Sequence, residues 1–155
     1  MLVVVLATVG FAAGRAAAGP PGLERKLNAT VNGTVRITSP AAGCAGIVTA
    51  ITDATLVGSP ALGPATIHTS ICVTSVVPND QFFGTFVITT RLGTLTGTIV
   101  ASSPDPPGAD PQRITGTLTP TGGSGPLAKA DDPLTLRAES HGTFPAPIDG
   151  TIAPT

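Results

Sequence analysis

Eight stretches of this sequence alternate apolar residues with threonine or other polar residues at a period of two. Such alternation is typical of a β-strand with one buried and one solvated face. Within 133–141, for example, Leu134, Leu136 and Ala138 share one face, and polar or charged residues share the other. The pattern predicts an all-β chain. Its expected strands are 29–38, 46–57, 64–77, 81–90, 93–101, 112–120, 133–141 and 146–153.

The breaks between these stretches are rich in residues that favour turns. Ser39-Pro40, Pro78-Asn79-Asp80, 91–93 and 122–125 all interrupt the alternation. The longest break, 102–111, is polar and rich in proline, which predicts an exposed hairpin loop. A length of 155 residues fits one domain.

Glycine followed by threonine and an apolar residue recurs about once per expected strand. Glycine within a strand permits a bulge, a sharp bend or a close backbone approach. Strands that must coil tightly are typical of a small closed barrel, which also removes sheet edges. We therefore predict a single antiparallel barrel of about eight strands, with a β-sandwich as the alternative and simple compositional bias as the competing explanation of the repeat. The repeat occurs at Gly33, Gly84, Gly93, Gly97, Gly116, Gly142 and Gly150.

The interior of such a barrel must consist mainly of aliphatic side chains, because only 3% of the residues are aromatic. If the barrel keeps a pocket, the inward positions of the central strands line it. Our candidate ligand-binding residues are Ile67, Ile71, Phe86, Ile88, Leu95 and Ile99.

The N-terminus has the pattern of an export signal. Residues 2–13 form an apolar run interrupted only by Thr8 and Gly10. The run is too short to span a bilayer but suits the core of a signal peptide. Ala16 and Ala18 precede the expected cleavage site, although no basic residue precedes the apolar run. We predict a signal peptide over 1–18, a leader over 19–27 and a barrel domain over 28–155. The alternative is a buried N-terminal strand or helix. The mature protein is then expected outside the cell, without a membrane span.

Cys44 and Cys72 are the only cysteines. An even count in an exported chain predicts a disulfide, which would stabilise the fold by about 3–4 kcal/mol. Two thiols this far apart are neither a C-x-x-C redox pair nor a complete zinc site.

Charge and motif patterns exclude several functions. A net charge of −1 without tryptophan or tyrosine argues against a nucleic-acid partner. His141 and Glu139 share a strand face and could form an acid–base pair, but Arg137 on that face favours an ordinary solvated row; His68 fits a half-exposed strand residue. Ser124 lies in a glycine-rich turn without the strand and helix that a nucleophile elbow requires. We therefore assign no catalytic residue, metal or cofactor.

Residues 114–132, ITGTLTPTGGSGPLAKADD, resemble the strand–turn–strand signature of the dirigent and allene oxide cyclase superfamily. Ser124 stands for the usual threonine, Leu127 for a phenylalanine and Asp132 for a glycine. Residues 82–99 also look like the hairpin that precedes the signature, so the resemblance covers roughly the C-terminal half. The matching residues are Gly122, Gly123, Gly125 and Ala130.

The resemblance implies an eight-stranded antiparallel barrel with a largely apolar cavity, often assembled as a trimer. The family's catalytic groups align with no motif here. Three functions follow as expectations. The first is a secreted barrel that binds a small apolar ligand without catalysis; the second is an envelope or interaction module that acts through its outer surface; the third is a cyclase, isomerase or stereo-directing protein.

Overall fold

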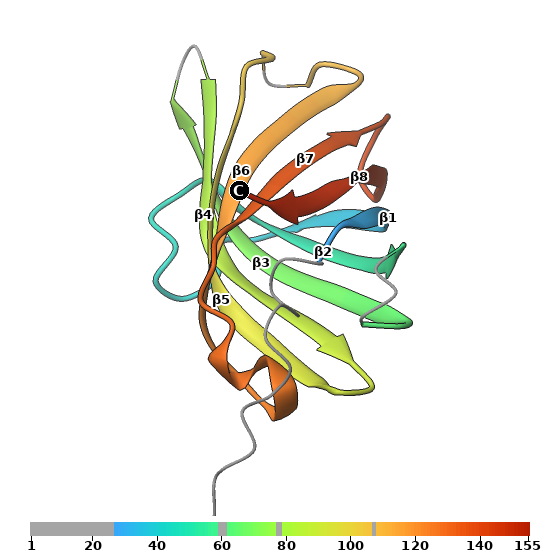
Figure 1. Ribbon diagram of the computed structural model, residues 1–155. Coiled ribbons are helices and arrows are strands. Elements are labelled where there is room, and N and C mark those ends of the chain that lie inside the picture. The colour runs from blue at the N-terminus through green and yellow to red at the C-terminus, as the bar shows by residue number, and fades with distance from the viewer. Residues whose placement is uncertain (1–26, 59–61, 77–78, 107) are drawn as a thin grey trace, which may run out of the picture.

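The computed structural model describes residues 27–58, 62–76, 79–106 and 108–155. Eight strands form a closed barrel, as Figure 1 shows. The predicted signal peptide, and the leader up to residue 26, lie outside the described residues. The strands are β1 (Ala29–Thr38), β2 (Val48–Val57), β3 (Ala65–Val76), β4 (Asn79–Thr90), β5 (Gly93–Ser103), β6 (Gln112–Gly123), β7 (Leu134–Ser140) and β8 (Ala146–Pro154).

Each strand pairs antiparallel with the next, and β8 pairs with β1 to close the sheet. The predicted all-β barrel is therefore confirmed, and the sandwich alternative is wrong. All eight expected strands are present. The largest difference in bounds is in β6, which runs on to Gly123 because the glycines that suggested a turn still pair with β5.

Glycine occupies an inward position in the middle of five strands, where neighbouring strands approach closely. At Gly97 a Cβ atom would lie 2.2 Å from the Thr119 carbonyl oxygen and 2.6 Å from the Phe86 ring. The register of β5 against β6 shifts at this residue, which is the position of a bulge. The glycines of the repeat therefore allow neighbouring strands to approach closely, as expected for the tightly coiled strands of a small barrel. The five residues are Gly33, Gly84, Gly97, Gly116 and Gly150.

A short 3-10 helix, η2 (Gly125–Lys129), packs against β5 and β6 at one end of the barrel (Figure 1). Its Leu127 is buried against the core. Gly125 begins the helix with a φ of 60°, and a Cβ there would lie 2.1 Å from the Leu92 carbonyl oxygen, so only glycine fits without strain. The Ser124 hydroxyl accepts a hydrogen bond from the Thr94 backbone N–H at 2.9 Å. Ser124 thus holds the end of the barrel together, as a turn residue would.

The half of the barrel next to η2 is packed solid. Its largest side chains are almost completely inaccessible to solvent, with Ile88 and Leu118 at 0% exposure. The other end carries the β1–β2, β3–β4, β5–β6 and β7–β8 connections. The two ends thus differ in what lies beside the core, and η2 packs against β5 and β6 at one of them.

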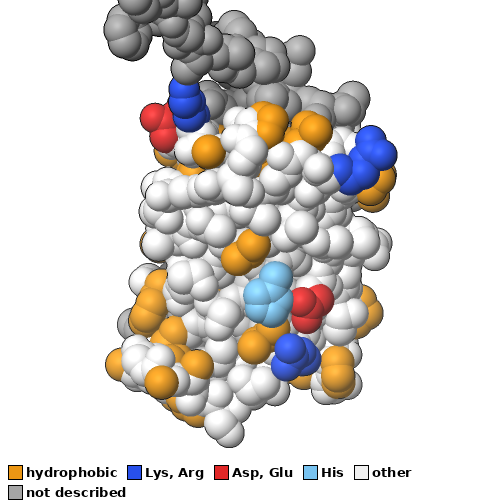
Figure 2. Space-filling model, turned by 90° about the horizontal axis from the view of Figure 1, so that it is seen from below, with side chains coloured by type: hydrophobic (Ala, Val, Ile, Leu, Met, Phe, Trp, Pro, Cys, Tyr) orange, Lys and Arg blue, Asp and Glu red, His pale blue; other side chains and the backbone are white. Residues whose placement is uncertain are grey.

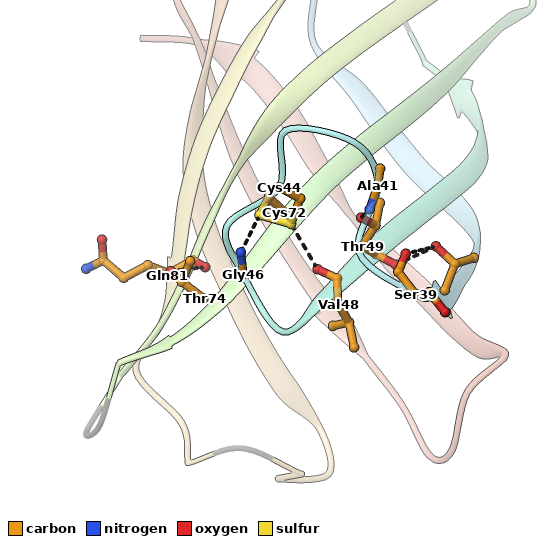
Figure 3. The surroundings of a disulfide bond; sticks show 10 residues. Ser39, Ala41, Cys44, Gly46, Val48, Thr49, Cys72, Thr74 and Gln81 are labelled. Carbon is orange, nitrogen blue, oxygen red and sulfur yellow. Dashed lines mark hydrogen bonds between the residues drawn. A yellow bond between two sulfur atoms is a disulfide. The ribbon is translucent and has the colours of Figure 1, made fainter.

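The predicted disulfide is confirmed: Cys44 in the β1–β2 loop is bonded to Cys72 on the outer face of β3 (Figure 3). The Gly46 backbone N–H donates to the Cys72 sulfur at 3.3 Å, and the Ala41 N–H donates to the Thr49 hydroxyl at 2.8 Å. Thr49 is consequently buried although it faces away from the barrel interior. The disulfide therefore holds the long β1–β2 loop, residues 39–47, against the outside of the sheet.

Charged side chains are sparse on the outer surface. Figure 2 shows a face on which a few charged side chains, some of them beside one another and beside a histidine, lie among uncharged polar atoms and scattered apolar ones. Among the residues that the structure describes, no helix has the length and apolar character needed to cross a membrane.

Candidate ligand-binding cavity

The open half of the barrel encloses a cavity of about 330 Å³. Side chains from the inner faces of all eight strands reach it, and β4 contributes only Phe82. The cavity lies between the packed half of the core and the loops of the open end. Its lining consists of Val31, Val35, Ile37, Val48, Ala50, Thr52, Ile67, Thr69, Ile71, Val73, Phe82, Ile99, Ala101, Gly108, Gln112, Ile114, Leu136, Ala138, Ser140, Phe144, Ile148 and Ile152.

The six residues proposed from sequence as cavity lining divide between the two halves of the barrel. Ile67, Ile71 and Ile99 line the cavity. The other three, Phe86, Ile88 and Leu95, also point inward, but they lie in the packed half and are not part of the lining. For these three the structure shows an inward position but no part in the wall of this cavity. Period-two alternation identifies the inward face of a strand, but it carries no information on depth along the barrel axis.

Sequence reasoning missed the polar residues of the cavity. Thr52 on β2 and Thr69 on β3 are direct cross-strand partners, and both point inward. Only 7% of Thr52 and 5% of Thr69 is exposed to solvent, which is unusual for threonine. Threonines occur throughout this sequence on the outer faces, so composition gave no signal. The signal was positional: 52 and 69 share parity with the apolar residues on either side of them.

Thr69 is the more unusual member of this pair. Its Oγ1 atom is buried and has no hydrogen-bond partner within the described part of the chain. Most buried side-chain polar atoms in proteins have such a partner, because a buried polar atom without a hydrogen bond destabilises the fold by about 1–3 kcal/mol. The cavity wall therefore holds an unsatisfied polar group.

The mouth of the cavity is formed by two loops and the strand ends beside them. Gly108 of the β5–β6 loop and Phe144 of the β7–β8 loop both belong to the lining, and 49% of Phe144 is exposed. Gln112 and Ser140, which are cross-strand partners on β6 and β7, add polar atoms near this opening. An entering molecule would thus pass an exposed aromatic ring and a polar rim.

An ion pair anchors the β5–β6 loop at this mouth. The Asp105 carboxylate accepts hydrogen bonds from the Arg113 backbone N–H at 2.7 Å and from Nε at 3.0 Å, and it also contacts Nη2. The Arg113 side-chain and backbone hydrogen bonds hold the pKa of the Asp105 carboxyl below its usual range. The Ser103 hydroxyl accepts a further bond from the Asp105 N–H at 3.2 Å.

The prediction of an exposed hairpin loop over 102–111 is therefore wrong in part. Ser103 belongs to β5 and is 0% exposed, and Asp105 is 8% exposed. Its proline-rich composition indicated a hairpin loop correctly. It gave no sign that one carboxylate would turn inward to meet an arginine across the loop.

Both histidines lie on the outer surface. The Nδ1 atom of His68 is 2.6 Å from Asp53 Oδ1, and Arg36 Nη2 is 3.9 Å from the same carboxylate. His141 Nε2 is 3.0 Å from Asp149 Oδ1, so its carboxylate partner is Asp149 and not Glu139. These pairs are half exposed, which fits solvated surface rows. Within the described ranges, no three His, Cys, Asp or Glu residues are placed to hold a metal ion.

The cavity lining, as described, contains no aspartate, glutamate, histidine, lysine or arginine. It offers van der Waals contact and a few neutral hydrogen-bonding groups. Comparison of the chain with models of protein families, with curated proteins and with solved structures finds no match. The function must therefore be argued from the cavity itself.

Proposed function

We propose that the protein is a binding protein that holds a small apolar molecule in the open half of its barrel. The observation that carries this proposal is the apolar cavity of about 330 Å³, which lies at the low end of the range for ligand pockets. Burial of apolar ligand surface against Ile67, Ile71 and Ile99 would supply the binding free energy. The packed half of the barrel gives this wall a rigid floor.

Binding is favoured over catalysis by the chemistry of the lining. General acid–base catalysis needs a titratable group within reach of the reacting atom. The described lining residues are aliphatic, aromatic, amide or hydroxyl-bearing, and none titrates near neutral pH. The polar Thr52–Thr69 pair is the one feature that favours a cyclase, an isomerase or a stereo-directing protein as the second candidate. Such a protein would have to act through the shape of its cavity.

We further propose that the protein functions outside the cell. The disulfide supports this setting, because disulfides persist in oxidising compartments, and so does the apolar run at residues 2–13. The relationship to the dirigent and allene oxide cyclase superfamily, and the trimer that it implies, remain part of this proposal. The barrel is compatible with both.

The test is a titration of the protein with naphthalene, followed by the fluorescence of the aromatic compound. The chain contains no tryptophan or tyrosine, so protein emission does not interfere. Ala138→Leu fills part of the cavity and is expected to weaken binding at least tenfold. Ala153→Leu makes the same change on the outer face of β8 and is expected to leave binding unchanged. Absence of saturable binding to the wild-type protein would refute the proposal.

A further inference from the structure

The cavity wall is chemically uneven at one place. Thr52 and Thr69 face the cavity side by side, and apolar residues flank both of them along their strands: Ala50 and Ala54 in β2, Ile67 and Ile71 in β3. Any molecule that reaches the wall between β2 and β3 therefore meets one polar spot in an apolar surface. We call Thr52 and Thr69 the threonine pair.

The hydroxyl of Thr69 is costly to keep in an empty barrel. Its Oγ1 atom is buried without a hydrogen-bond partner among the described groups. A valine would fill the same volume without this cost, and valine already occupies the inward position Val73 of the same strand. Rotation about the Cα–Cβ bond exchanges the hydroxyl with the methyl group, so that the hydroxyl can turn toward a molecule in the cavity. A partner supplied by a ligand would satisfy this group.

The rest of the wall restricts the charge of that ligand. None of the described lining residues carries a charge. A carboxylate or ammonium group buried against this wall would lose its hydration without gaining a counter-ion. The lining therefore selects against charged molecules.

We propose that the cavity recognises neutral, largely apolar molecules that carry one hydrogen-bonding oxygen, and that the Thr69 hydroxyl, beside Thr52, binds this oxygen. The inference rests on the cavity being a binding site, as proposed above. A threonine hydroxyl both donates and accepts, so a ligand hydroxyl and a ligand carbonyl are equally suitable partners. The pair thus sets both the polarity and the orientation of the bound molecule.

The experiment compares three bicyclic compounds: naphthalene, 2-naphthol and 2-naphthoate. They share one apolar framework and differ in having no polar group, one hydroxyl and one carboxylate. Fluorescence titration of the wild-type protein at neutral pH is expected to give an affinity for 2-naphthol about three- to tenfold higher than for naphthalene, the size of one net hydrogen bond. 2-Naphthoate is expected to bind at least tenfold more weakly than 2-naphthol.

Two variants assign the preference to Thr69. Thr69→Val is expected to bring the affinity for 2-naphthol down to that for naphthalene while leaving naphthalene binding intact. Thr69→Ser keeps a hydroxyl and is expected to retain the preference. The matched control is Thr66→Val, which makes the same change at an exposed position of β3 and is expected to behave as wild type.

The outcomes separate this inference from the proposed function. Equal binding of naphthalene and 2-naphthol by the wild-type protein would overturn the inference alone, and so would tighter binding of 2-naphthoate. A preference that survives Thr69→Val but disappears in Thr52→Val would overturn the role of Thr69. Absence of binding by all three compounds would refute the binding function, and with it this inference.

Discussion

Thr69 illustrates how a single residue can be suited to binding at the expense of stability. The buried Oγ1 atom has no partner within the described chain, while the side chains around it are apolar. Polar groups of this kind are uncommon in native interiors and lower the stability of the unliganded fold.

We predict that Thr69→Val raises the free energy of unfolding of the ligand-free protein by about 1 kcal/mol, because it removes an unpaired buried hydroxyl at nearly constant volume. Urea denaturation of both proteins measures the difference. A loss of stability would show that the hydroxyl is already bonded, for instance to water. The same substitution at Thr66 is the control.

Gly97 shows the opposite case, in which a residue serves the fold alone. A Cβ at this position would collide with the Thr119 carbonyl oxygen and the Phe86 ring. We predict that Gly97→Ala lowers the free energy of unfolding by roughly 1–3 kcal/mol through overpacking.

Gly122 provides the comparison for this prediction. Its nearest potential neighbour, Thr96 Oγ1, would be 3.4 Å from a new Cβ, so Gly122→Ala is expected to cost much less. Thermal unfolding followed by circular dichroism distinguishes the two variants. Equal effects would mean that the glycines reflect composition and not close strand approach.

At the scale of elements, the positions of the strands were predictable, and the internal contacts of the loops between them were not. Strands follow from local alternation, as in β7, where Leu134, Leu136 and Ala138 share one face. The Asp105–Arg113 pair depends on a loop that folds back on itself, which local pattern does not encode. The identity of cavity residues was out of reach for a similar reason. Ile67 and Ile88 alternate alike and are cross-strand partners, yet only Ile67 belongs to the cavity lining, a difference that depends on how side chains of several strands pack together.

The Asp105–Arg113 pair predicts a specific dependence on pH. The folded-state pKa of Asp105 is lowered, so its contribution to stability is fully present above the unfolded-state value of about 3.9 and is lost as the pH falls through the lower folded-state value. Asp105→Asn should therefore be less stable than wild type from about pH 5 to 7, where the Asp105 carboxyl is ionised in both the folded and the unfolded protein. The difference should shrink below about pH 3.9.

Urea midpoints measured across this range test the assignment. Asp110→Asn removes an exposed carboxylate from the same loop and controls for net charge. A difference between Asp105→Asn and wild type that persists undiminished in strong acid would mean that Asp105 acts through something other than its charge.

The disulfide acts on a second element, the β1–β2 loop. Cys44 and Cys72 are 28 residues apart, so the chain-entropy estimate for breaking the bond is about 3–4 kcal/mol. We predict this loss of stability on reduction, while the closed barrel remains folded. Unfolding curves with and without reductant, together with a Cys44→Ser/Cys72→Ser variant, measure it. A reduced protein as stable as the oxidised one would contradict the prediction.

At the scale of the whole molecule, the barrel consists of two unlike halves. Beside η2, the side chains of Phe86, Ile88 and Leu118 fill the interior. Toward the open end, the interior is a cavity reached past Gly108 and Phe144. The packed half stabilises the fold, and this leaves the open half free to hold a ligand.

The most direct test of this division is methyl NMR of isoleucine-labelled protein during titration with naphthalene. Isoleucines sample both halves and the outer surface. The account predicts shifts at cavity methyl groups such as Ile67, Ile71 and Ile99, with little change at Ile88 in the packed half or at the exposed Ile47. Shifts confined to Ile47, or no saturable shift at the cavity methyl groups, would contradict it.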